Sequence, residues 1–237
     1  MSRLADGGDW RLLAAQAFDH RGSLGNGAAM RVAPVAVAAA AAAGDPAAAL
    51  LAVRSAVITH AHPEGVDVAA VAAVATTLAL ASPAERPLDR YSYLQTLTGT
   101  ARTERMRRGL EAVCQLHPGA TASEVIARVG NGVAASESVP AAIACFLAYP
   151  DSFPAAVHFA VTLGGDTDTI ASMTGAIAGA RHGRHAIPDS WQDRTDAAAH
   201  AAHIAAALIE RLHNPEPTRS DIATRSGDQY HSRQVES

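Results

Sequence analysis

The chain has no lysine: all 19 basic residues among its 237 are arginine. A lysine nucleophile and a lysine Schiff base are therefore excluded. The formal net charge of -4 lacks the basic field typical of nucleic-acid-binding domains, so we expect no nucleic-acid partner. Aromatic residues make up only 4%, whereas alanine is about a quarter of the chain. Since alanine favours helices over strands, we expect an all-α fold.

Cysteines and long apolar runs are also scarce. Cys114 and Cys145 are too few for a disulfide framework. The opening residues, MSRLADGGDW, show no basic segment followed by an apolar stretch, so no secretory signal is predicted. The apolar run 35–43 is too short to span a bilayer. We therefore expect a cytoplasmic protein with no membrane partner, and the pattern indicates no particular oligomeric state.

Apolar residues recur at helical spacing between breaks made by glycine, proline and aspartate. They predict one helical domain over residues 1–213, followed by a disordered tail over 214–237 that is rich in polar residues and proline. No helix is assigned to residues 83–100. The expected helices are 9–17, 28–43, 46–60, 65–81, 101–116, 121–129, 138–149, 154–162, 169–182 and 196–212.

The segment GGDTDT (164–169) carries the strongest chemical signal. Asp166 and Asp168 alternate, so both carboxylates can converge on one ion if the segment is extended. Carboxylate and hydroxyl oxygens suit Mg²⁺, Mn²⁺ or Ca²⁺ rather than zinc. The structural alternative is a helix N-cap, in which one acid accepts main-chain N–H groups of the helix over 169–182.

Two further loops could contribute to a binding or catalytic site. RGSLGNG (21–27) leads into a helix and could present main-chain N–H groups to phosphate, although an ordinary Asn-Gly turn has the same pattern. THAHP (59–63) places two histidines at a helix end, where we expect one of them to cap the last carbonyl groups.

Taken together, these loops resemble the ADP-ribosylglycohydrolase family. The resemblance covers about residues 9–212 and is closest to the branch that acts on serine-linked ADP-ribose and O-acetyl-ADP-ribose. It implies an orthogonal all-α bundle with two Mg²⁺ ions in a cleft, with Mn²⁺ as a substitute. The matching stretches, in the family's order, are GNGAAMRVAP (25–34), THAHP (59–63), GNGVAASESVPAAIACF (130–146), GGDTDTIASMTGAIAGA (164–180) and PDSWQ (188–192).

The resemblance also implies which residues hold metal and substrate. Asp166, Asp168 and Thr169 would supply metal ligands, and the two aspartates would be catalytic. Phe18 matches a ring that stacks on adenine, while Leu24 replaces a second aromatic side chain. His60 would contact the phosphates or ribose, and Asn131 and Val133 would line the adenosine side. The diphosphate and ribose would be wrapped by Arg21, Gly22, Ser23, Leu24, Gly25, Asn26 and Gly27.

The implied activity is Mg²⁺-dependent hydrolysis of the glycosidic bond that joins ADP-ribose to a serine or arginine side chain or to an O-acyl group. ADP-ribose or an ADP-ribosylated protein would be the partner. The family also carries an N-terminal Thr-Asp-Asp-Thr motif, which this sequence lacks. Three interpretations follow: a fragment of an active hydrolase, a catalytically incomplete module that binds ADP-ribose or a protein, or a half-site completed by a separate chain.

Overall fold

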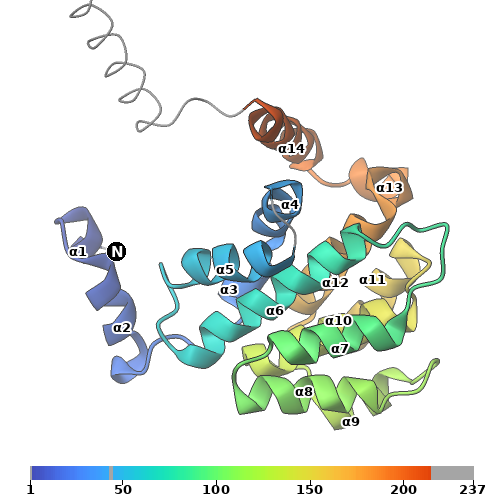
Figure 1. Cartoon of the computed structure of the whole chain (residues 1–237), viewed down its shortest axis with the longest axis horizontal. Helices are drawn as coiled ribbons and strands as arrows, with labels where there is room; N and C mark the ends of the chain where they lie inside the picture. The colour runs from blue at the N-terminus through green and yellow to red at the C-terminus, as the bar shows by residue number, and fades with distance from the viewer. Residues whose placement is uncertain (1, 43–44, 215–237) are drawn as a thin grey trace, which may run out of the picture. The chain divides into compact units, whose positions relative to one another are not determined.

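The computed structural model describes residues 2–42 and 45–214, and the side chains of 4–41 and 47–214. Across these residues every regular element is a helix, which confirms the predicted all-α class. By its internal contacts the chain divides into residues 1–194 and 195–237. The first unit (Figure 1) contains α1 (Ser2–Ala5), α2 (Trp10–His20), α3 (Gly27–Met30), α4 (Ala33–Ala42), α5 (Asp45–Ala56), α6 (Pro63–Leu80), α7 (Arg90–Thr100), α8 (Glu104–Cys114), α9 (Ala122–Val129), α10 (Ala135–Ala148), α11 (Phe153–Thr162), α12 (Thr167–His182), a 3-10 turn (Arg184–Ala186) and α13 (Asp189–Gln192).

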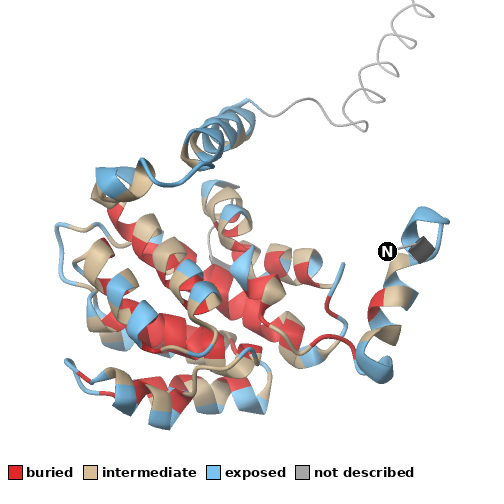
Figure 2. Ribbon diagram, turned by 180° about the vertical axis from the view of Figure 1, so that it is seen from behind, coloured by how far each residue is buried: buried red, intermediate tan, exposed pale blue. Residues whose placement is uncertain are grey.

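Helix α6 is the central element of the first unit and packs against α3, α4, α5, α7, α10 and α12. Its residues are apolar around most of its circumference, so it is buried on several sides rather than along one stripe (Figure 2). By length and composition α6 could cross a membrane, but 72% of it is buried inside the protein. Small residues such as Ala69 and Ala73 are fully buried and allow neighbouring helices to approach closely.

A proline interrupts the helix predicted over residues 28–43. The chain forms α3 and α4 instead, separated at Arg31 and Val32. Pro34 has no N–H to donate, and its ring would clash with the carbonyl group of Met30 in a continuous helix. The predicted single helix is therefore wrong at this point.

Helix α10 begins at Ala135, three residues before the predicted start, so Pro140 lies inside the helix rather than in its first turn. A proline there leaves the Ser136 carbonyl group without its helical N–H donor. Gly109 of α8 approaches this position: a Cβ added to it would lie 2.7 Å from Pro140 Cγ and 3.0 Å from the Ser136 oxygen. The α8–α10 packing therefore requires glycine at 109.

Two buried charged side chains hold the connections between helices. Asp67 in α6 accepts hydrogen bonds from the main-chain N–H groups of Arg102 (2.9 Å) and Thr103 (2.8 Å), just before α8. Arg181 in α12 has a fully buried side chain that donates to the main-chain oxygens of Ser82, Arg86 and Pro150 and to Asp151. Arg181 thereby fixes the segment between α6 and α7 against the end of α12.

The described part of the second unit contains helix α14 (Ala198–His213), in which no residue is buried. Residues 215–237 lie outside the described residues, so the predicted tail over most of 214–237 and the domain boundary at 213 stay predictions.

Candidate functional site

Three loops that are far apart in the sequence meet at Asp166. The Asn26 Nδ2 group, 140 residues earlier, donates a short hydrogen bond to Asp166 Oδ2. The Asp166 main-chain N–H donates to the Asn131 carbonyl oxygen at 2.8 Å. The structure thus brings together one residue from each of the loops 21–27, 130–133 and 164–169.

The loop 21–27 is fixed by close main-chain approaches. Gly22 has φ +73°, and a Cβ there would lie 2.5 Å from the main-chain nitrogen of His62. Gly65, in the first turn of α6, leaves no room for a Cβ against the Ser23 carbonyl oxygen. Ser23 is buried, and its hydroxyl accepts from the Gly25 N–H at 3.3 Å. These glycines let the loop lie directly on the start of α6.

The same loop is joined to the start of α10. Gly25 forms a β-bridge with Ala134, and the Ala135 N–H donates to the Leu24 carbonyl oxygen at 3.2 Å. Leu24 itself is half-buried. The main chain therefore holds loop 21–27 beside the loop that contains Asn131.

The loop 130–133 is shaped by Glu137 and Asn131. The Gly132 N–H donates to Glu137 Oε2 at 3.0 Å, and Asn131 Nδ2 donates to the Leu163 carbonyl oxygen at 2.7 Å. Val133 is 70% exposed, so its side chain is available to a ligand. Asn131 consequently contacts the segment 163–166 through both its side chain and its main chain.

Asp166 occupies the N-cap position of α12, but its side chain forms no capping hydrogen bond. Its carboxylate instead accepts from Asn26 and, at 3.1 Å, from Thr169 Oγ1. The helix-cap alternative therefore does not explain Asp166. Asp168 is exposed, and its Oδ1 accepts from the Thr169 N–H at 2.9 Å.

Asp166 stands at the N-cap of α12, and Asp168 and Thr169 lie in the first turn, so the segment is helical and the predicted convergence of the two carboxylates along an extended segment is wrong. Among the described residues, no group of three or more His, Cys, Asp or Glu side chains is placed to hold a metal ion. Asp166, Asp168 and Thr169 nevertheless supply hard oxygen donors, and Mg²⁺ typically binds one or two carboxylates and keeps several waters. The donor set therefore fits part of a Mg²⁺ shell.

His60 is buried beside the loop 21–27. Its Nδ1 lies 2.8 Å from Thr59 Oγ1, and the Arg31 guanidinium donates to the same hydroxyl at 2.8 Å. Burial lowers the pKa of His60 below its ordinary value of 6.5, and the Arg31 cation lowers it further, while a hydrogen bond with the Gly25 main chain acts in the opposite direction. Folding therefore shifts His60 toward its neutral form.

This lowered pKa gives a pH-dependent prediction. Because folded His60 binds protons less readily than unfolded His60, its neutral form contributes stability that is present above about pH 6.5 and is lost as the pH falls through the lower pKa of the folded state. We expect urea unfolding to show that wild-type protein loses more stability than His60→Gln between pH 7.5 and pH 5, values chosen to bracket about 6.5. Parallel curves for the two proteins would contradict the assignment.

The second histidine has a capping function that differs from the prediction. His62 Nδ1 accepts from the Glu64 N–H at 3.1 Å and caps the start of α6. The expected cap at the end of the preceding helix is therefore wrong. Pro63 ends the previous segment and begins α6 at the position where proline is favoured.

The predicted adenine platform lies at the end of α2. Phe18 is 67% exposed and has φ 55°, within a left-handed stretch that includes Asp19 and His20. Arg21 is exposed, and its Nε donates to the Phe18 carbonyl oxygen at 3.4 Å. No ring contact or side-chain hydrogen bond among the described residues joins Phe18 to the Asp166 site, so adenine stacking on Phe18 stays a prediction.

Sequence reasoning missed Ser138, which is fully buried and accepts a hydrogen bond from Asn26 Nδ2 at 3.0 Å. Its position within the GNGVAASES stretch is visible in the sequence, but a serine in a first helical turn has no pattern that reveals a partner 112 residues away.

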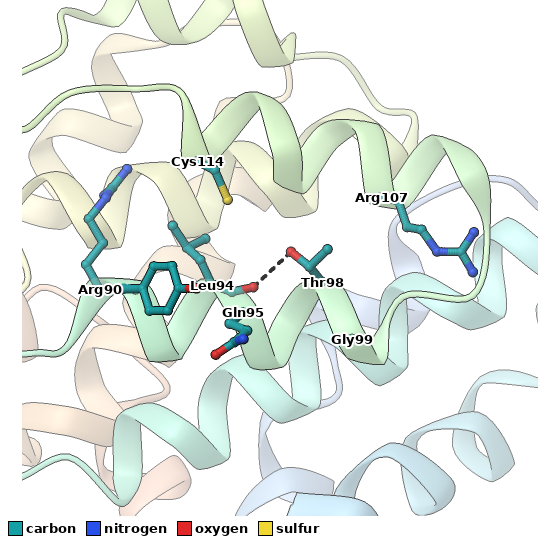
Figure 3. A pocket seen from close by; sticks show the side chains of 8 residues that line it. Arg90, Leu94, Gln95, Thr98, Gly99, Arg107 and Cys114 are labelled. Atoms are coloured by element: carbon teal, nitrogen blue, oxygen red, sulfur yellow. Dashed lines mark hydrogen bonds between the residues drawn. The ribbon is translucent and has the colours of Figure 1, made fainter.

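A separate groove lies between α7 and α8 (Figure 3), with a volume of about 850 Å³. Its floor includes buried Leu94, and Arg107 and exposed Tyr91 lie along it. None of the predicted site residues lines this groove.

Comparison with known proteins shows the family of the chain. The family model described as ADP-ribosylglycohydrolase matches residues 1–221. Human ADP-ribosylhydrolase ARH3 is 37% identical over 220 residues, covering 78% of this chain and 59% of the human protein. Mouse ADP-ribosylhydrolase ARH3 is 35% identical over 220 residues, with 78% and 58% covered.

The fold is also similar to a solved structure described as an ADP-ribosylglycohydrolase-related protein complex. The TM-score is 0.65 at 28% identity, with 89% of this chain and 71% of that chain covered. The chain spans about 59% of the length of the human relative. Because the family model covers nearly the whole chain, the protein belongs to the ADP-ribosylglycohydrolase family.

Proposed function

We propose that this chain acts in Mg²⁺-dependent hydrolysis of the glycosidic bond between ADP-ribose and a serine or arginine side chain or an O-acyl group. The observation that carries the proposal is the junction at Asp166, where Asn26 bonds the carboxylate and the Asn131 carbonyl oxygen accepts from the main-chain N–H, so that three loops meet at one aspartate. The similarity to ADP-ribosylhydrolase ARH3 supports the substrate class.

In this proposal each loop contacts a different part of the substrate. The Gly22 and Gly25 N–H groups are donated to Ala17 and Ser23, so the other main-chain N–H groups of residues 22–27 would face the diphosphate, in the manner of other anion-binding loops. Buried His60 lies behind them, and its hydrogen bonds with Thr59 and the Gly25 main chain hold this loop, so the predicted contact with phosphate or ribose would have to replace one of them. Asn131 and exposed Val133 line the adenosine side. ADP-ribose would therefore contact all three loops where they meet around Asp166.

Asp166, Asp168 and Thr169 would hold Mg²⁺, which when bound orients the ribose hydroxyl groups and stabilises developing charge. The chain's own carboxylates favour the positive charge of an oxocarbenium-like transition state. The Asn26 and Thr169 hydrogen bonds to Asp166 fix the direction of its carboxylate, so its charge is positioned before substrate arrives.

The test measures release of ADP-ribose by the full chain from a serine-ADP-ribosylated peptide, an arginine-ADP-ribosylated peptide and O-acetyl-ADP-ribose. We expect release from at least one substrate with MgCl₂, loss of release in EDTA, and at least a tenfold lower rate for Asp166→Asn, because the variant keeps the shape and loses the charge (tenfold is about 1.4 kcal/mol). Unchanged turnover in Asp166→Asn or in EDTA would overturn the metal-site proposal.

One observation favours a second candidate, an ADP-ribose-binding module without turnover: the described residues gather no cluster of three acidic or other metal-ligating side chains. Isothermal titration calorimetry with ADP-ribose distinguishes the two functions. Binding without release from any of the three substrates supports the module, whereas neither binding nor release contradicts both candidates.

A further inference from the structure

Ser138 lies behind Asn26, and its hydrogen bonds are to Asn26 and Ala134 rather than to the predicted metal-binding residues. It is in the first turns of α10 and is fully buried. Its hydroxyl donates to the Ala134 carbonyl oxygen at 3.3 Å and accepts from Asn26 Nδ2 at 3.0 Å. A hydroxyl has one hydrogen and two lone pairs, so Ala134 takes the hydrogen of Ser138 and Asn26 takes one of its lone pairs.

The Asn26 amide is oriented by two acceptors. Its Nδ2 group donates one hydrogen to Ser138 and the other to Asp166 Oδ2. An ionised carboxylate only accepts hydrogen bonds, so the amide must present nitrogen rather than oxygen to Asp166. Asn26 also occupies the N-cap position of α3 without using its side chain as the cap. The Asn26 side-chain amide therefore forms the contact between the loops instead of capping α3.

From this arrangement we infer that Ser138 is a positioning residue: it orients the Asn26 amide, which in turn fixes the Asp166 carboxylate toward bound ADP-ribose. The inference rests on the proposed function, because it takes the Asp166 site as the place where ADP-ribose binds. The chain of hydrogen bonds runs from the Ala134 carbonyl oxygen through Ser138 and Asn26 to Asp166.

The main chain makes the inference testable. Loop 21–27 is joined to α10 by the Gly25–Ala134 bridge and by the bond from the Ala135 N–H to the Leu24 oxygen, neither of which involves the Ser138 side chain. Removal of the hydroxyl therefore leaves the loop in place and releases only the Asn26 amide. The expected consequence is a misdirected Asp166 in a folded protein.

The experiment measures the Kd of the full chain for ADP-ribose by calorimetry in MgCl₂. We expect Ser138→Ala to weaken binding about tenfold, because one anchoring hydrogen bond of a buried network is lost. Ser138→Thr keeps the hydroxyl and should bind within about twofold of wild type. Ser82→Ala is the control for deleting a serine hydroxyl away from the site: Ser82 is half-buried, lies two residues beyond α6, and its hydroxyl donates to the Leu78 carbonyl oxygen.

A double-mutant cycle separates positioning from a general structural effect. If Ser138 acts through Asn26, Ser138→Ala should change the Kd by less than about twofold in an Asn26→Ala background. An equal loss in both backgrounds would overturn the inference. If Ser138→Ala does not fold in urea-unfolding controls, Ser138→Cys takes its place, since a thiol of similar shape is a weak acceptor and should also weaken binding.

The outcomes also separate the inference from the proposed function. Wild-type protein that binds ADP-ribose while Ser138→Ala binds equally well contradicts the inference alone. Wild-type protein that binds no ADP-ribose contradicts the proposed function and the inference with it.

Discussion

Gly165→Ala is expected to destabilise the protein by about 3 kcal/mol or more and to weaken ADP-ribose binding at least a hundredfold. Gly165 has φ +63°, and a Cβ there would collide with the Asn131 carbonyl oxygen and lie 2.7 Å from Asn131 Cγ. That oxygen accepts from the Asp166 N–H. The collision would push apart the two loops whose contact forms the site, so stability and binding should fall together.

Its neighbour provides a matched control. Gly164 also has φ +63°, but a Cβ added there would meet no atom within 4 Å. Gly164→Ala should carry only the cost of a left-handed alanine, about 1 to 2 kcal/mol, with little change in affinity. Urea unfolding and calorimetry on both variants check the difference. Equal losses in the two variants would show that backbone strain, rather than the approach of Asn131, accounts for the effect.

Arg181→Met should lower the free energy of unfolding by about 3 kcal/mol, since three carbonyl oxygens lose a charged donor and burial prevents full replacement by water. The Arg181 side chain donates to the main-chain oxygens of Pro150 (3.0 Å), Ser82 (2.9 Å) and Arg86 (2.6 Å). For a chain of this size the change corresponds to a Tm lower by roughly 6 to 12 °C. Thermal unfolding followed by circular dichroism measures it.

Arg108→Ala serves as the control for removing an arginine. Arg108 pairs with Glu104 at 2.9 Å on an exposed helix face, where such pairs contribute about 0.3 to 0.5 kcal/mol. A loss for Arg181→Met no larger than that of Arg108→Ala would contradict the structural importance of the buried network. ADP-ribose affinity should change little in either variant, because both side chains lie away from the Asp166 junction.

The helices that were best predicted from the sequence are those in which the apolar spacing and the flanking breaks indicate the same bounds. The helices predicted over 65–81 and 121–129 match α6 (Pro63–Leu80) and α9 (Ala122–Val129) to within two residues at each end. Helix α7 was missed because RYSYLQTLTGT contains several residues of low helix propensity. Burial of Tyr93, Leu94 and Leu97 against the core stabilises it instead. Tertiary packing of this kind has no local signature in a single sequence.

The candidate site, too, could be predicted only in part from the sequence. The local motifs GGDTDT and RGSLGNG could be recognised from residue type and spacing, and the family resemblance indicated that they belong together. The partners of Asp166 could not be derived, because Asn26 and Asn131 reach it only through the packing of α3, α10 and α12. Ser138 is one step further removed, since it contacts Asp166 only through Asn26.

The junction at Asp166 also constrains the order of folding. Helices form from contacts within a few residues, whereas the Asn26–Asp166 and Asn26–Ser138 contacts close loops of 140 and 112 residues. Closing such loops costs entropy before any contact repays it, so long-range pairings form late. The binding site should therefore be among the last parts to assemble during refolding. Recovery of ADP-ribose binding would then lag behind recovery of helical circular dichroism.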